Sequence, residues 1–309
     1  MKELSAFLAG ILDPFFMAFS IPNSWDASTY SVLFNIRLPR IIAAVLVGAA
    51  LSTAGAAYQG MFQNPLVSPD ILGASAGAGF GAALAIYFYL DSGYITLFAF
   101  LGGLISVGIA YLISRLTRDS TTLSMVLAGI LVGSLFSSAT SYIKLVTDTN
   151  DQLPAITYWL MGSLSGATMD DVIFAGIVIT AGIIPIYLLR WRMNVLTLDE
   201  DEARSIGLNT NLLRIIMIIC ATLITSVAVS ISGIIGWVGL VIPHFCRMLF
   251  GFDYRRIIPA SIVMGSGFLL LVDDLSRTIA TIEVSLGILT AFVGAPIFAY
   301  LLMIGGRIL

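Results

Sequence analysis

The chain has 309 residues, of which 58% are hydrophobic and only 11% are charged, and its mean hydropathy is +0.99. A water-soluble domain carries about a quarter charged residues, so this composition excludes an ordinary soluble fold. The formal net charge of −3 gives no reason to expect a nucleic-acid partner, because in a membrane protein the positions of Lys and Arg matter more than their balance against acids.

Apolar runs of about twenty residues, long enough to cross a hydrocarbon core of about 30 Å, recur along nearly the whole chain. Turn-favouring groups such as Asn64-Pro65 and Asp91-Ser92-Gly93 separate them. The pattern predicts an all-α polytopic membrane protein with about nine to ten transmembrane helices. We expect nine spans, at residues 40–63, 70–90, 95–114, 121–146, 171–190, 211–231, 234–251, 257–279 and 284–304.

The first 39 residues are harder to interpret. Residues 4–21 are apolar, but Asp13-Pro14 interrupts them and the run is short for a span. We interpret residues 1–39 as an N-terminal external or interfacial segment before a transmembrane domain at 40–309. Two alternatives stay open: residues 4–21 cross as a poor tenth span, or the natural protein begins upstream with a first helix that this sequence lacks.

The basic residues predict the orientation of the chain. Basic residues gather on the cytoplasmic side of membrane proteins, and a cytoplasmic C-terminus places ten inside and four outside. The inner residues are Arg115, Arg118, Arg190, Arg192, Arg204, Arg214, Arg247, Arg255, Arg256 and Arg307, and the outer ones are Arg37, Arg40, Lys144 and Arg277.

Two polar features stand out from the apolar background. The longest inner loop, at about 195–211, has an acidic start and a Gly207 stop, which predicts a short cytoplasmic helix. It is either a solvated connector or a docking site for a cytoplasmic partner. The outward arginines Arg37, Arg40 and Arg277 have a rigid fork suited to carboxylates and could receive an acidic protein surface. Taken singly, each is also a plausible interfacial anchor.

Small residues crowd the stretch from Gly73 to Gly81, which predicts close helix contact. The stretch also matches G-x-G-x-x-A, but no strand precedes it, so a dinucleotide site is not expected. Cys220, Cys246 and His244 have no partners at metal-ligand spacing and are expected to be packing residues.

No phosphate-binding G-x-x-x-x-G-K-[ST] loop and no catalytic constellation occur in the chain. We therefore expect that the chain is not an enzyme and that any ATP is bound by a partner chain.

Several motifs then resemble a known family. Ile36-Arg-Leu-Pro-Arg40, Gln63-Asn-Pro-Leu66 and Leu72-Gly-Ala-Ser75 resemble the opening of the iron-chelate and cobalamin (FecCD-like) permeases of type II ABC importers. The later motifs of the family follow in the same order: Tyr158-Trp-Leu-Met-Gly162, Asp201-Glu-Ala-Arg-Ser-Ile-Gly-Leu208, Gly239-Leu-Val-Ile-Pro-His244 with Arg247, and Gly294-Ala-Pro-Ile297.

The resemblance implies a homodimer in a prokaryotic cytoplasmic membrane, with membrane lipid around it and the pathway at the dimer interface. It implies a periplasmic or lipid-anchored substrate-binding protein docked on Arg37, Arg40 and Arg277. It also implies two cytoplasmic ATPases, which carry ATP and Mg and bind the inner loop, with no cofactor on this chain. The coupling residues would be Asp199, Glu200, Asp201, Glu202, Ala203, Arg204 and Gly207.

The pathway walls of the family correspond to residues 121–146 and 284–304, with the cytoplasmic gate near Thr121 and Thr122. The few polar residues of the first wall are candidates to line the pathway: Ser134, Ser137, Ser138, Thr140 and Ser141. Such a wall would suit a bulky cargo that slides.

An iron-siderophore or haem is the leading cargo, ahead of cobalamin and of molybdate or tungstate, and family frequency alone sets this order. A different class is an ion-coupled secondary transporter, which usually carries ionisable residues at mid-membrane. Asp273, Asp274 and Glu283 lie instead toward the outer ends of their helices, where partner docking or helix capping explains them equally well.

Overall fold

The computed structural model describes residues 31–117, 122–197 and 209–305, and within these ranges the chain forms helices and no strands. In chain order these are η1 Val32–Arg37, α3 Leu38–Met61, η2 Pro69–Leu72, α4 Ala74–Tyr87, α5 Ser92–Leu116, α6 Thr122–Val146, α7 Gln152–Met161, α8 Met169–Leu196, α10 Thr210–Ser232, α11 Val238–Phe250, α12 Tyr254–Thr278 and α13 Leu286–Gly305.

Each of the nine predicted spans corresponds to a helix. Six helical segments in the described ranges are long and apolar enough to cross a membrane, namely Val32–Met61, Ser92–Leu116, Leu123–Val146, Met169–Leu196, Thr210–Ser232 and Tyr254–Thr278. The first of them begins at Val32, because the π-helix η1 runs directly into α3. Residues 32–39, which the sequence assigned to the N-terminal segment, are therefore continuous with the first span, and residues 1–30 lie outside the description.

Two predicted spans are replaced by shorter helices that follow an irregular stretch. In the predicted span 70–90, the turn η2 ends at Gly73, whose φ of +81° starts α4 in a new direction, and α4 has only 14 residues. In the predicted span 234–251, α11 begins only at Val238, after Gly233 and Trp237 adopt positive φ values. A hydropathy window averages over such breaks: Gly233–Trp237 is apolar throughout, and the single acid Asp70 of η2 is outweighed by its apolar neighbours.

The sequence did not predict α7. This ten-residue helix lies between α6 and α8, and it buries Gln152 and Ile156. It is too short to register in a search for runs of about twenty apolar residues.

The predicted close contact of small residues is confirmed. A Cβ added at Gly77 would overlap the carbonyl oxygen of Gly102 in α5, and one added at Gly81 would overlap that of Phe98. Helices approach this closely in lipid because packing between backbones replaces the hydrophobic drive that water provides.

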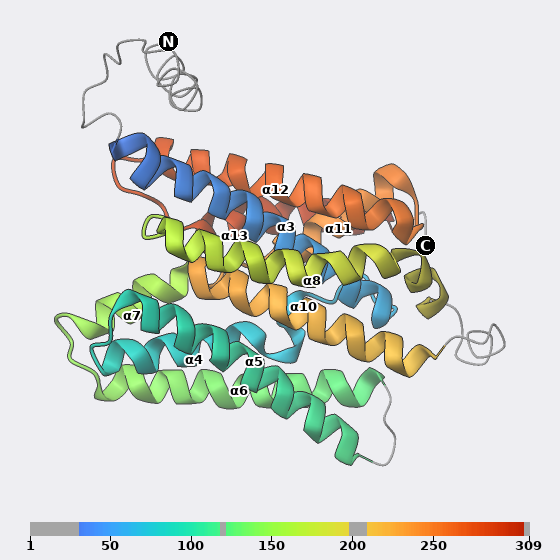
Figure 1. Cartoon of the computed structure of the whole chain (residues 1–309), viewed down its shortest axis with the longest axis horizontal. Helices are drawn as coiled ribbons and strands as arrows, with labels where there is room; N and C mark the ends of the chain where they lie inside the picture. The colour runs from blue at the N-terminus through green and yellow to red at the C-terminus, as the bar shows by residue number, and fades with distance from the viewer. Residues whose placement is uncertain (1–30, 118–121, 198–208, 306–309) are drawn as a thin grey trace, which may run out of the picture.

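Figure 1 shows a layered bundle in which the long helices run roughly along the long axis of the molecule. α3 packs against α8, α10, α11 and α12 and is the most buried of the six long helices. At one end of the bundle lie the N-terminal end of α3 and the C-terminal end of α12. At the other end lie the C-terminal end of α8 and the N-terminal end of α10 (Figure 1).

The backbone contact at Gly77 predicts that even one methyl group there is costly. Gly77→Ala should lower the stability of the purified protein by about 1–3 kcal/mol, because the added Cβ has no room. Gly267→Ala is the matched control, since a Cβ at this mid-helix glycine of α12 meets nothing within 4 Å. Thermal unfolding in detergent measures both variants, and equal midpoints would contradict the close packing.

Candidate functional site

Arg40 lies in the first turn of α3 and is buried, with 8% of its surface exposed. Its Nε donates to both carboxylate oxygens of Asp273 in α12, at 2.9 and 3.0 Å, and its Nη2 lies 2.5 Å from a carboxylate oxygen of Glu283. Asp273 itself is fully buried. A charge-assisted pair with this geometry is strong, so it joins the N-terminal end of α3 to the C-terminal part of α12.

This pairing explains two of the three acids that the sequence assigned to partner docking or helix capping. Asp273 and Glu283 neutralise the Arg40 guanidinium inside the protein. The pairing joins residues 233 positions apart in sequence, so no local pattern could identify it.

The other two predicted docking residues are nearer the surface. Arg277 follows Asp273 by one turn of α12, its side chain is 32% exposed, and it pairs with Asp274 as well as Asp273. Arg37 is partly exposed in η1, three residues before Arg40. The structure thus brings Arg40 and Arg277 onto one carboxylate and places Arg37 at the same end of the bundle (Figure 1). Their docking role stays a prediction.

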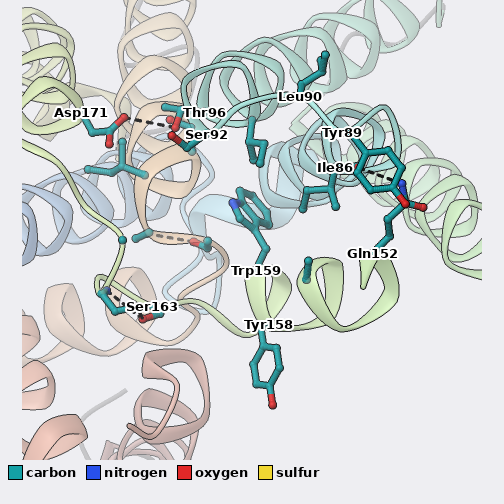
Figure 2. Close-up of a pocket in the computed structure, with 18 of the residues that line it drawn as sticks. Ile86, Tyr89, Leu90, Ser92, Thr96, Gln152, Tyr158, Trp159, Ser163 and Asp171 are labelled. Atoms are coloured by element: carbon teal, nitrogen blue, oxygen red, sulfur yellow. Dashed lines mark hydrogen bonds between the residues drawn. The ribbon is translucent and has the colours of Figure 1, made fainter. Parts of the chain in front are cut away.

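A cleft of about 570 Å³ opens at this same end, between α7 and the neighbouring ends of α5, α8 and α10. Figure 2 shows Trp159 and Thr96 facing the cleft while Tyr158 points away from it. The polar groups of its lining are largely satisfied: Gln152 Nε2 donates to the Tyr87 carbonyl at 2.9 Å, and Asp171 forms a capping box with Thr168. The hydrogen bonds of Gln152 and Asp171 are therefore made within the protein, and neither group is left free for chemistry in the cleft.

The connection after α7 links this cleft to the ionic group formed by Arg40, Asp273 and Glu283. The Ser163 amide donates to the Ser232 carbonyl at 2.8 Å, and the Leu286 amide donates to the Gly162 carbonyl at 2.9 Å. The Ser163 hydroxyl lies 3.4 Å from the Glu283 carboxylate that also receives Arg40. These hydrogen bonds thus join five helix ends at one end of the bundle, those of α3, α7, α10, α12 and α13.

The predicted coupling residues Asp199, Glu200, Asp201, Glu202, Ala203, Arg204 and Gly207 lie outside the described residues. The residues that flank them are described. Gln63, just after α3, donates from Nε2 to the carbonyl of Leu196 at the end of α8, at 2.8 Å. Arg40 is 21 residues before Met61, the last residue of α3, or roughly 32 Å along the helix. The predicted docking arginine and the described flanks of the coupling segment therefore lie at opposite ends of the bundle.

A second buried arginine lies near the coupling end, in α11. Arg247 is 9% exposed, and its Nη2 donates to the Gln59 side chain of α3 at 2.6 Å. Gln59 in turn donates to the Val67 carbonyl at 3.2 Å. No described carboxylate pairs with Arg247. Arg247 belongs to one of the family motifs in the sequence, but no local pattern identifies Gln59 as its partner.

The candidate pathway serines of α6 share one face. Ser134, Ser137, Ser138 and Ser141 are exposed in the single chain, whereas Thr140 is buried on the opposite side. The hydroxyls of Ser134 and Ser141 donate to the carbonyls of Ile130 and Ser137, at 2.8 and 3.0 Å. The face is therefore weakly polar and interspersed with exposed leucines.

The two predicted gate residues are described only in part. Thr122 begins α6, but its side chain is outside the description, as is the whole of Thr121. Of the second predicted wall, Phe292 of α13 is strongly exposed in the single chain.

His244 and the two cysteines occupy packing positions. The His244 ring lies 6.2 Å from the Phe298 ring, centroid to centroid, and Cys220 and Cys246 are buried free thiols. The burial of both thiols agrees with the prediction that the cysteines pack. His244 is half-buried within α11, which continues through Pro243, and its Nδ1 has no hydrogen-bond partner among the described residues.

Comparison with known proteins gives consistent matches along the chain. The FecCD transport family matches residues 4–304. A molybdate import system permease of Haemophilus influenzae is 37% identical over 89% of this chain and 82% of its own length. An iron chelatin transport system permease of Helicobacter pylori is 40% identical over 91% of this chain and 85% of its own.

A solved structure, described as an inward-facing conformation of a metal-chelate type ABC transporter, superposes with a TM-score of 0.86. It is 36% identical to this chain, and the match covers 92% of this chain and 91% of the solved one. Both the sequence family and the fold are thus shared over nearly the full length.

The Arg40 pairing generates a stability prediction. Asp273→Ala removes the buried partner of Arg40 and should destabilise the protein by about 3–5 kcal/mol, because a buried charge is left poorly compensated. Asp274→Ala is the matched control: its side chain is 58% exposed, and an exposed pair contributes about 0–1 kcal/mol. Unfolding midpoints in detergent test this, and similar losses for both variants would contradict a structural role for Asp273.

Proposed function

The chain belongs to the FecCD transport family of ABC transporter permeases, and from this premise we propose that it forms the membrane pathway of an importer for a metal chelate. In this proposal two copies enclose the pathway in a prokaryotic cytoplasmic membrane. The nine helices that correspond to the predicted spans, six long and three shorter, serve as the membrane-embedded elements of each copy.

The observation that carries the proposal is the position of the two partner sites at opposite ends of α3. Arg37, Arg40 and Arg277 belong to one end, and the flanks of the coupling segment, Leu196 and Thr210, belong to the other. An importer needs this separation, because the binding protein delivers cargo on one side and the ATPases work on the other.

We propose that docking depends on the partly exposed arginines, Arg37 and Arg277, more than on Arg40. The Arg40 guanidinium is already bound to two carboxylates, and releasing it would leave Asp273 buried without its partner. Arg277 is partly exposed and pairs with the exposed Asp274. An acidic partner could take the place of Asp274 with little loss of free energy, because exposed ion pairs are weak.

Transport then follows alternating access. Binding of ATP by the partner ATPases draws the two coupling segments together, and the movement reaches the gate at the inner end of α6 through the adjoining helix ends. The weakly polar serine face of α6 lines the path. A wall with few fixed charges favours passage of a bulky, shielded chelate over tight binding.

An iron-siderophore or haem is the cargo that we propose, with cobalamin and molybdate or tungstate as alternatives within the family. The relatives named above include an iron chelatin permease and a molybdate permease, and their sequence identities to this chain are similar. Membership of this family favours an ATP-driven importer over the ion-coupled carrier.

The docking proposal predicts a selective loss of affinity. Arg277→Glu combined with Arg37→Glu should weaken docking of the cognate binding protein by about tenfold or more, because attraction to an acidic surface becomes repulsion. Lys144→Glu is the control, a charge reversal of the fourth outward basic residue. Surface plasmon resonance with the complex in nanodiscs measures the affinity, and an unchanged value in the double variant would reject docking at these arginines.

The function itself is tested by uptake in cells that depend on this chain and its partners. Labelled ferric chelate should accumulate, and Asp201→Lys with Glu202→Lys should abolish uptake by releasing the ATPases. Asp170→Lys, at the opposite end of α8, should leave uptake intact.

The other outcomes of the uptake experiment are equally informative. Accumulation of labelled cobalamin or molybdate in place of iron would replace the proposed cargo. Uptake that continues without any ATPase would contradict the importer mechanism.

A further inference from the structure

A small basic pocket lies where the C-terminal end of α5 meets the N-terminal end of α10, and Met61, Phe62 and Met125 complete its lining. These ends of α5 and α10 lie at the end of the bundle that holds the flanks of the coupling segment (Figure 1). The volume of the pocket is about 80 Å³. Two guanidinium groups line it, from Arg115 and Arg214, together with the polar side chains of Ser114 and Asn211. Both arginines belong to the group that the charge count assigned to the cytoplasmic side.

Neither arginine has an acidic partner among the described residues. Arg115 donates from Nε to the Tyr111 hydroxyl at 3.0 Å and stacks over its ring, with the guanidinium carbon 5.5 Å from the ring centre. The Arg214 Nε is buried and has no hydrogen-bond acceptor in the described chain. An unsatisfied buried donor on a charged group is costly, so an anion in this pocket would be stabilising.

An apolar groove continues directly from the basic pocket toward the middle of the bundle. It has a volume of about 380 Å³, lies between the same two helices, and shares Tyr111, Ile215 and Ile218 with the pocket. Leu104 and Gly108 of α5 and Leu223 of α10 line its far part. From Arg115 back to Leu104 the groove follows α5 for about 16 Å, which is half of a hydrocarbon core of roughly 30 Å.

We propose that this pocket and groove form a binding site for an anionic phospholipid of the cytoplasmic leaflet. The phosphate of the headgroup lies between Arg115 and Arg214, and one acyl chain lies in the groove between α5 and α10. The match in charge, the continuity of the two cavities and the depth of one leaflet together select a phospholipid over a free anion. The inference depends on the proposed membrane orientation and is independent of the cargo.

The site would also join α5 to α10, the helix that follows the coupling segment. α10 begins directly after the coupling segment, and Arg214 lies in its first turns. A lipid that holds α5 and α10 together would stabilise the inner end of the bundle against separation during transport.

The test is native mass spectrometry of the full-length protein in detergent, titrated with phosphatidylglycerol and with phosphatidylcholine. Phosphatidylglycerol should bind more tightly. Arg115→Gln with Arg214→Gln should weaken its binding by about 25-fold, because each arginine near an anionic lipid contributes roughly fivefold. Arg190→Gln with Arg192→Gln, two basic residues at the inner end of α8, should leave the binding unchanged.

A second pair of variants tests the groove. Gly108→Leu places a side chain in the groove at a glycine where a Cβ meets nothing within 4 Å, and it should weaken the binding of both lipids. Gly267→Leu, an equally open glycine of α12, should weaken neither.

Three results would overturn the proposal. The first is equal retention of phosphatidylglycerol by the wild type and the double arginine variant. The second is displacement of the lipid by excess inorganic phosphate with no effect of Gly108→Leu, which would identify an anion pocket alone. The third is a Gly108→Leu protein that loses its dimer but keeps its lipid, which would assign the groove to the second copy. Because none of these readouts requires transport, their failure is distinguishable from failure of the importer function.

Discussion

The interior of a bilayer offers no water to buried polar groups, and this constraint governs the polar contacts of the whole molecule. Arg40 and Asp273 are both buried, and each satisfies the other across two helices. Where a hydroxyl has no distant partner, as at Ser134, it donates to the carbonyl one turn back in its own helix. These contacts therefore either join helices or satisfy a group within its own helix, and the first kind determines how the ends of the bundle are held. A few buried atoms, among them Thr53 Oγ1, Thr225 Oγ1 and the Arg214 Nε, have no hydrogen-bond partner in the described chain.

α3 connects the two ends that these contacts define. Its first turn carries Arg40, bound to α12, and its last turns carry Gln59, bound to Arg247 of α11. Between them, glycine contacts allow α3 to approach its neighbours closely: a Cβ at Gly48 or Gly55 would overlap the backbone of α12 or α11. A helix that is rigidly packed along its length and bonded at both ends suits a protein whose partners act on opposite sides of a membrane.

The faces that remain exposed in a single chain differ in chemistry. The serine face of α6 is weakly polar, whereas the groove between α5 and α10 is apolar and ends in two arginines that have no acidic partner in the described chain. Such a division is expected of a subunit that meets a second copy or a cargo on one side and lipid on another. Charge at the end of an apolar groove distinguishes a lipid headgroup site from a simple helix contact.

Length and hydropathy were sufficient to predict an all-helical membrane protein and its nine apolar segments, whereas the orientation that the positions of Lys and Arg indicate stays a prediction. Hydropathy is averaged over neighbouring residues, so it can be calculated from the sequence without knowing which segments meet. The ordered motifs predicted the family for the same reason, since each motif is contiguous.

Only the tertiary structure decided that Arg40 is an internal partner of Asp273, that α4 and α11 are short helices after irregular turns, and that α7 exists. Each depends on residues far apart in the chain that meet in space, or on a backbone turn too short for a hydropathy window to separate from the apolar residues around it. Hydropathy measures how readily a segment leaves water, and it contains no information about which segment it will meet.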